Sequence, residues 1–320
     1  MSLSERAARP AAVRATPARA AAHRRVEGRT PLQSAWRRFR ADRAAMAALV
    51  VLAAIVVFAL AAPLLAGWTG HTYHGTYPKT GVDEFGRPAG PGGEFWVGAD
   101  GLGRDLLVRA AYGGRISLLV GAAATAIATV LGVTIGMVSG YVGGTVDTVL
   151  SRCLEIVISF PYVLIAIVLA TTFPPASVVG SMALTILVIS FFSFAVMARV
   201  VRGQVLSLKE REFVEAARAL GAGRVYIMRS ELLPNVAAPV TVLASLLLPT
   251  SIVSEATLSF LGVGVQPPMP SWGGMLNEAT DLYRVVWWPL LVPGLLLLLT
   301  TLAFNILGDA IRDAVDPRRS

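Results

Sequence analysis

Six apolar segments of roughly 20 residues each limit what this chain can fold into. They lie near residues 45–66, 117–139, 153–173, 178–198, 236–256 and 287–307. A helix of that length crosses the hydrocarbon core of a bilayer, and it satisfies its backbone hydrogen bonds internally. The chain is 55% hydrophobic with a mean hydropathy of +0.64, which is more apolar than an average soluble domain. The sequence therefore predicts an all-α membrane protein with six transmembrane helices.

The basic residues predict how these helices are oriented, because loops on the cytoplasmic side are enriched in Lys and Arg. With the N-terminus inside, 22 of the 28 Lys and Arg residues lie in cytoplasmic segments and 6 lie outside. We therefore expect a plasma-membrane protein with both termini and the 200–235 loop in the cytoplasm. The formal net charge of +8 is then a topology signal, and we expect no nucleic-acid partner.

Composition divides the chain into four parts. Residues 1–30 are rich in Ala and Arg and predict a disordered basic cytoplasmic tail. Residues 31–116 should hold an interfacial helix, the first transmembrane helix and an external loop. Residues 117–307 are expected to form a five-helix transport core, with a cytoplasmic loop at 200–235, and residues 308–320 a cytoplasmic tail.

The interfacial helix is predicted from one apolar stripe beside several arginines. Leu32, Trp36 and Phe39 recur at helical spacing, and the arginines between and after them suit the lipid headgroup region. This helix should lie in the inner membrane interface, in contact with lipid.

The charged segment from Glu212 to Asn235 separates two apolar runs and is longer than a simple turn requires. Its first part is rich in helix formers. Four apolar positions there fall on one face of a helix, which suits docking against another protein; they are Phe213, Ala216, Ala217 and Leu220. Gly221 and Gly223 can end this helix. A second helix should follow, with Pro234 near the start of the fifth span.

The segment Glu215-Ala216-Ala217, followed after three residues by Gly221 and later by Leu233-Pro234, resembles the EAA loop of permease subunits of bacterial ABC importers. One position departs from the family pattern, because Glu231 stands where Ile is frequent. In that family the loop is a coupling helix that sits in a cleft of the cytoplasmic ATPase. An ordinary amphipathic cytoplasmic loop is the alternative. The resemblance implies ATPase-coupling roles for Glu212, Glu215, Ala216, Ala217, Gly221, Leu233 and Pro234.

Further segments, 98–117, 255–276 and 305–318, are similar to C-type permeases of the peptide/nickel importer family. The resemblance implies the type I ABC importer permease fold and alternating access. It also implies three kinds of partner: a second, B-type permease subunit; two ATP-binding subunits or one fused ATPase; and an extracytoplasmic substrate-binding protein. This chain would bind no cofactor, since ATP and Mg would be bound by the partner ATPases.

Motifs for catalysis are missing from the sequence. It contains no phosphate-binding G-x-x-x-x-G-K-[ST] loop, no H-E-x-x-H and no G-x-S-x-G. We therefore expect a non-catalytic subunit rather than an enzyme. A self-sufficient, ion-coupled secondary transporter is the rival class, but it needs ionisable groups at mid-membrane. The candidates, Glu155, Glu255 and Asn305, lie only near span ends.

Di- or oligopeptides are the expected substrates. Nickel or another small solute is the alternative for the same machinery. Nickel favours imidazole or soft ligands along its route, and the predicted spans contain no His.

Two sets of residues within the spans are candidates for specific roles. Gly132, Gly136 and Gly140 recur at every fourth residue, which lets helices approach closely, either within one subunit or at a dimer seam. Ser251, Ser254 and Glu255 lie near the outer end of the fifth span. Since a membrane-embedded acid is costly unless it faces protein or water, Glu255 is predicted to line or gate the substrate path. A structural pair with an arginine, or a carboxylate at the interface, is the alternative.

The external loop and the third span give four smaller predictions. His71 and His74 are too isolated for a metal site and suit a solvated loop. Arg104, Asp105 and Arg109 can pair with one another at the start of an interfacial helix. In the third span, Arg152 and Glu155 are spaced to pair on one helix face. Pro161 should kink that span.

Overall fold

A computed structural model describes residues 39–315 of the chain. The predicted tail at 1–30, the interfacial helix up to residue 38 and the end of the C-terminal tail at 316–320 lie outside the described residues. Within 39–315 the chain is helical, and its extended residues form only isolated bridges. The helices, in chain order, are α2 (Arg43–Leu60), α3 (Ala62–Thr69), α4 (Leu106–Val142), α5 (Gly144–Ser159), α6 (Tyr162–Thr172), α7 (Val178–Leu208), α8 (Glu212–Ala219), α9 (Arg224–Tyr226), the π-helix η1 (Ile227–Leu232), α10 (Leu233–Phe260), α11 (Trp272–Glu278) and α12 (Trp288–Val315).

Five of these helical runs are long and apolar enough to span a membrane, namely α2, α4, α7, the Arg224–Phe260 run and α12. The predicted third span is instead a pair, α5 and α6, bent by 81°. The break falls at Phe160 and Pro161, which are extended, because a residue before proline avoids the helical conformation. The prediction of a proline kink is therefore confirmed, and counting this pair as one span gives the six predicted.

Two boundaries drawn from hydropathy fall inside continuous helices. The predicted interfacial helix and the second span form one continuous helix, so the boundary at 116/117 falls inside α4. The boundary at 307/308 falls inside α12, which continues to Val315. In both cases the helix continues through polar residues and glycines, so the hydropathy change does not mark a helix end.

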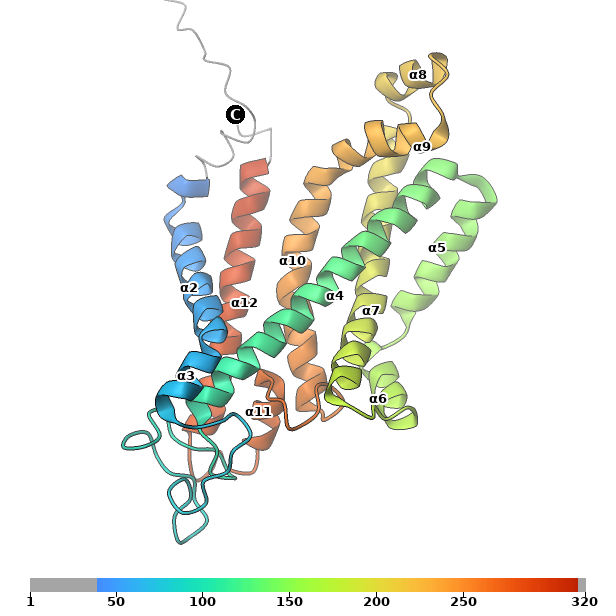
Figure 1. Ribbon diagram of the computed structural model, residues 1–320. Coiled ribbons are helices and arrows are strands. Elements are labelled where there is room, and N and C mark those ends of the chain that lie inside the picture. Colours follow the sequence, from blue (N-terminus) through green and yellow to red (C-terminus); the bar gives the residue numbers. More distant parts are fainter. Residues whose placement is uncertain (1–38, 316–320) are drawn as a thin grey trace, which may run out of the picture.

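The helices form a bundle in which α4 crosses the others diagonally (Figure 1). The start of α2, the end of α12 and α8 lie at one end of the bundle. The loop at 70–105 and α11 lie at the opposite end. An even number of membrane crossings brings the two ends of the described chain to the same side.

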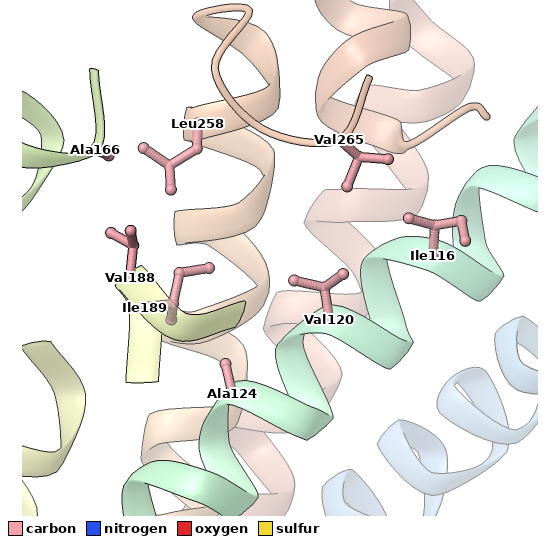
Figure 2. Packing of buried hydrophobic residues seen from close by; sticks show 8 residues of the cluster. All are labelled: Ile116, Val120, Ala124, Ala166, Val188, Ile189, Leu258 and Val265. Atoms are coloured by element: carbon pink, nitrogen blue, oxygen red, sulfur yellow. The ribbon is translucent and has the colours of Figure 1, made fainter. Parts of the chain in front are cut away.

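One apolar cluster joins α4, α6, α7, α10 and the loop after α10 (Figure 2). Val120 on α4, Ile189 on α7 and Leu258 on α10 are each almost completely buried there. Val265 reaches the same cluster from the loop between α10 and α11. This contact fixes the loop against the helices at the end of the bundle that lies opposite α8.

The glycine stripe of α4 packs against α7 of the same chain. A Cβ atom on Gly136 would lie 2.5 Å from the carbonyl oxygen of Ala198, which is closer than real Cβ atoms approach. Cβ atoms on Gly132 and Gly140 would meet α7 side chains at 2.5 and 2.9 Å. Of the two roles that the spacing allows, the structure therefore shows packing within one subunit.

We predict that Gly136→Ala lowers stability, because the added methyl group meets backbone that cannot rotate away. The expected loss is about 1–3 kcal/mol of unfolding free energy, the usual cost of overpacking. Gly203→Ala is the matched control, since Gly203 lies on α7 with open space around it, and alanine favours a helix. The midpoint of thermal unfolding in detergent measures both. An unchanged midpoint for Gly136→Ala would show that α4 and α7 are not in this close contact.

Candidate functional site

Helix α8 is held in place by its own terminal sequence. Glu212 and Glu215 lie in its first turn and Arg218 in its last, the charge order that suits the helix dipole. At its C-terminus the backbone N–H of Gly221 donates to the Arg218 carbonyl, and the N–H of Ala222 donates to the carbonyl five residues earlier. These two bonds form a Schellman motif. It places Gly221 at a φ of 82°, where a side chain is strained.

One face of α8 is anchored in an apolar cluster at the end of the bundle. Val214 is completely buried, and Phe213 and Ala217 are partly buried beside it. Their neighbours come from four other elements; the fully buried or nearly buried ones are Met137 of α4, Met197, Val201 and Val205 of α7, Ile227 and Leu232 of η1, and Val236 of α10. We call this set, with Val214, the coupling cluster. Because it joins α8 to three long helices, a displacement of α8 must act on all of them.

The four apolar positions predicted to form one docking face of α8 lie in two different environments. Phe213 and Ala217 face the cluster within this chain, whereas Ala216 is exposed and Leu220 is 89% exposed. Val214 takes the buried position instead. Leu220 is the residue where the helix ends, so its side chain extends beyond the supporting surface although helical spacing aligns it with Phe213.

The outer face of α8 is a mixed apolar and charged surface. Glu212, Glu215 and Ala216 are exposed on it, and Leu220 is the most exposed large apolar side chain of the described residues. Arg218 extends sideways, with its guanidinium 5.7 Å from the centre of the Tyr141 ring. An exposed leucine with charged residues beside it is typical of a contact surface for another protein.

The Leu233-Pro234 pair lies within a continuous helical run. The predicted second helix is not separate from the fifth span, because η1 passes directly into α10. The N–H of Leu233 donates to the carbonyl of Met228, five residues earlier. This wider π-type turn relieves the clash that Pro234 would make in a regular α-helix, so the chain stays helical into α10.

The three candidates for the substrate path are placed differently from one another. Glu255 is completely buried in this chain, and Ser251 is 1% exposed. Glu255 accepts a hydrogen bond of 2.7 Å from Ser259, and Ser251 shares one of 3.0 Å with Thr125 of α4. Only Ser254 is partly exposed. Within the described part of this chain, Glu255 therefore lies buried against a serine hydroxyl and does not pair with an arginine, and its role on the substrate path stays a prediction.

A buried ion network lies at the opposite end of the bundle from α8. Arg104 binds Asp100 at 2.6 Å and Glu278 of α11 at 2.6 Å. Arg109 contacts the same two carboxylates at 3.1 and 2.8 Å. The predicted pairing among Arg104, Asp105 and Arg109 was therefore wrong in its partners, because a residue distant in sequence, Glu278, completes the network. The network ties the external loop to α4 and α11.

His71 has a structural role in this loop. Its Nδ1 lies 2.7 Å from Asp105, whose other oxygen accepts two backbone N–H groups in the first turn of α4. The ring stacks on Phe95 and is 3% exposed. The prediction of a solvated loop was therefore wrong for His71, whereas His74 is exposed. Within residues 39–315 no group of three or more His, Cys, Asp or Glu side chains is placed to hold a metal ion.

The long apolar helices define a multi-pass membrane protein. Comparison with known families agrees with this class, because residues 132–320 match the family described as "Binding-protein-dependent transport system inner membrane component". Residues 30–80 match "N-terminal TM domain of oligopeptide transport permease C". The chain belongs to this family of inner-membrane transport components, among its C-type permease subunits.

Curated relatives cover most of the chain. It is 46% identical to the oligopeptide transport system permease protein OppC of Escherichia coli K12 over 294 residues, which span 92% of this chain and 93% of that protein. It is 40% identical to the glutathione transport system permease protein GsiD of Shigella flexneri, over 91% of each chain. The dipeptide transport system permease protein DppC of Alkalihalophilus pseudofirmus is 36% identical over 90% of each.

A solved structure shows the same fold. The chain resembles a chain of the MetNI methionine ABC transporter in an inward-facing conformation, with a TM-score of 0.52 and 22% identity. The match covers 66% of this chain and 96% of that chain. It confirms the predicted all-α fold of an ABC importer permease.

We predict that Glu278→Gln destabilises the protein, because two buried guanidinium groups then share a single carboxylate. The expected loss is about 1–3 kcal/mol. The lower end is favoured because the Glu278 side chain is 34% exposed. Glu84→Gln is the control, because Glu84 is exposed on the external loop at 70–105. It should leave the thermal midpoint unchanged. Equal midpoints for the two variants would contradict a stabilising role for the network.

Proposed function

We propose that this chain is a permease subunit of an ATP-driven importer that moves di- or oligopeptides into the cell by alternating access. The chain itself carries out no chemistry. Its role is to convert movement of partner ATPases into opening and closing of a path across the membrane. Hydrolysis of ATP, with its Mg ion, belongs to those partners, so this chain binds no cofactor of its own.

The anchored α8 is the observation that carries this proposal. A helix of eight residues has little stability alone, but α8 rests on the coupling cluster and is closed by the Schellman motif at Gly221. The short helix and the ends of α4, α7 and α10 therefore move as one unit. We assign ATPase coupling to this segment, with the exposed Glu212, Glu215, Ala216 and Leu220 facing the partner.

The basic residues and the fold together support one orientation. The ends of the described chain and α8 lie at the same end of the bundle (Figure 1). Among residues 39–315, most Lys and Arg residues lie in the segments at that end. By the positive-inside rule, this distribution supports a cytoplasmic location for both termini and α8, with the external loop outside.

Three partners complete the importer. A B-type permease subunit would form the other half of the path, and two ATP-binding subunits or one fused ATPase would contact the coupling segments. An extracytoplasmic substrate-binding protein would deliver the substrate at the outer end. The family description, which names a binding-protein-dependent system, supports this last partner.

Peptides are the best-supported substrates. The relatives quoted above are named for oligopeptide, dipeptide and glutathione transport, and all three are peptides or peptide-like. Nickel is disfavoured because the helices of the described chain contain no His, and imidazole is a preferred nickel ligand.

Purification of the complex tests the proposal directly. We expect a mild-detergent pull-down of the chain to recover a second permease and ATP-binding subunits, identified by mass spectrometry. The recovered complex, in liposomes with its binding protein, should accumulate labelled peptide only when ATP is present. A chain that purifies alone and transports without ATP would contradict the proposal and favour an ion-coupled secondary transporter.

Leu220→Asp should weaken attachment of the ATPases, because it places a charge where the exposed leucine would fill a partner's apolar pocket. Loss of a central apolar anchor costs about 2 kcal/mol or more, which is roughly thirtyfold in affinity. The control is Phe85→Asp, since Phe85 is similarly exposed, at 84%, but lies on the external loop. Retention of the ATPases after salt washes measures the effect. Equal retention in both variants would show that Leu220 is not at the interface.

A further inference from the structure

Helices α5 and α6 contribute few buried residues to the rest of the bundle. Leu154 is the only residue of α5 that is buried, and Ala166 is the only one of α6. Leu154 packs on Ala195 and Ala198 of α7. The α5–α6 pair also contains the 81° bend. A segment with so few buried contacts can change its position at low cost, unless another interaction fixes it.

A charged pair supplies that second attachment. Asp147, in the first turn of α5, accepts hydrogen bonds from Arg202 of α7 at 2.6 and 2.7 Å, one to each carboxylate oxygen. Ser139, near the end of α4, donates to the same carboxylate at 2.5 Å. The Asp147 and Arg202 side chains are only 17% and 31% exposed. A bidentate pair of this kind fixes orientation as well as distance, because the planar guanidinium must match the carboxylate.

Arg202 lies next to the anchorage of α8. It stands between Val201 and Val205, which belong to the coupling cluster together with Val214 of α8. It also lies where α4 and α7 touch, since a Cβ atom on Gly136 would come within 3.1 Å of the Arg202 backbone nitrogen. The backbone of Arg202 therefore belongs to the unit that moves with α8, while its side chain holds α5.

We propose that the Asp147–Arg202 pair is the link through which movement of α8 reaches α5 and α6. The pair positions the broken span and takes no part in substrate binding. When the ends of α4 and α7 shift with α8, the guanidinium draws the start of α5 with them, and the bend at Pro161 passes the shift to α6. This inference rests on the proposed importer function and assigns a further step to it.

The test is the ratio of peptide taken up to ATP hydrolysed, measured on the reconstituted complex. Asp147→Asn preserves the shape of the side chain but removes its charge. We expect it to keep ATPase activity near the wild-type rate and to lower the ratio at least about fivefold, the lower bound of typical coupling between sites. Arg202→Lys keeps the charge and loses the bidentate geometry, so its ratio should fall between those of Asp147→Asn and the wild type.

Arg152→Gln is the matched control. Arg152 also pairs with a carboxylate on α5, that of Glu155 at 2.8 Å, but this pair is exposed and lies within one helix. Its loss cannot disconnect α5 from α7, so the ratio should stay at the wild-type value. If Asp147→Asn does not assemble, Ser139→Ala removes only one hydrogen bond from the same carboxylate, and a lowered ratio is expected there too.

Three outcomes would overturn the inference. The first is an unchanged ratio in Asp147→Asn, or in Ser139→Ala where the former does not assemble. The second is a parallel fall of uptake and ATPase activity in an assembled complex, which a merely structural role would produce. The third is an equal fall of the ratio in Arg152→Gln. None of these outcomes affects the proposed function itself, which fails only if the wild-type complex lacks ATPases or transports without ATP.

Discussion

The close contact between α4 and α7 is the interaction on which the rest of this structure depends. Without side chains on the glycine stripe, the two backbones approach until a methyl group would not fit between them. In lipid, such contacts replace the hydrophobic effect as the source of helix association, because the surrounding acyl chains are as apolar as the helices. The contact runs toward the end of the bundle that carries α8, where α4, α7 and α10 meet in the coupling cluster.

The two ends of the bundle are built by different means. At the α8 end, an apolar cluster supports a short helix whose outer face remains open to a partner. At the other end, buried ion pairs and the His71–Asp105 contact fix a long loop against α4 and α11. Ion pairs of this kind are costly to bury and strongly destabilising when broken. They suit a part that must keep one shape. The α5–α6 pair has few buried residues of its own, and an ion pair between Asp147 and Arg202 ties its start to α7.

Alternating access needs a rigid unit, a mobile unit and a connection between them. In the mechanism that we propose, the α4–α7–α10 unit with α8 is the rigid unit, because its helices are close-packed. The broken span is the moving unit of that proposal, since the backbone at Pro161 is extended between two helices. A bidentate charged pair suits the connection because it fixes both the distance and the orientation of the two helices that it joins.

Local chemistry explains what could be predicted from the sequence by itself. The length of the apolar runs determined the helical class, Pro161 determined the break in the third span, and Gly221 determined the end of α8, because each acts on its own few residues. The helix ends of α4 and α12 could not be predicted from hydropathy, which reports solvent preference and not hydrogen bonding.

Only the tertiary structure decided the partners of polar groups far apart in sequence. Glu278 completes the arginine network, Asp147 meets Arg202, Glu255 turns inward to serine hydroxyls, and Leu220 is left exposed. Those choices depend on which helices lie side by side, and periodicity within one helix contains no information about its neighbours.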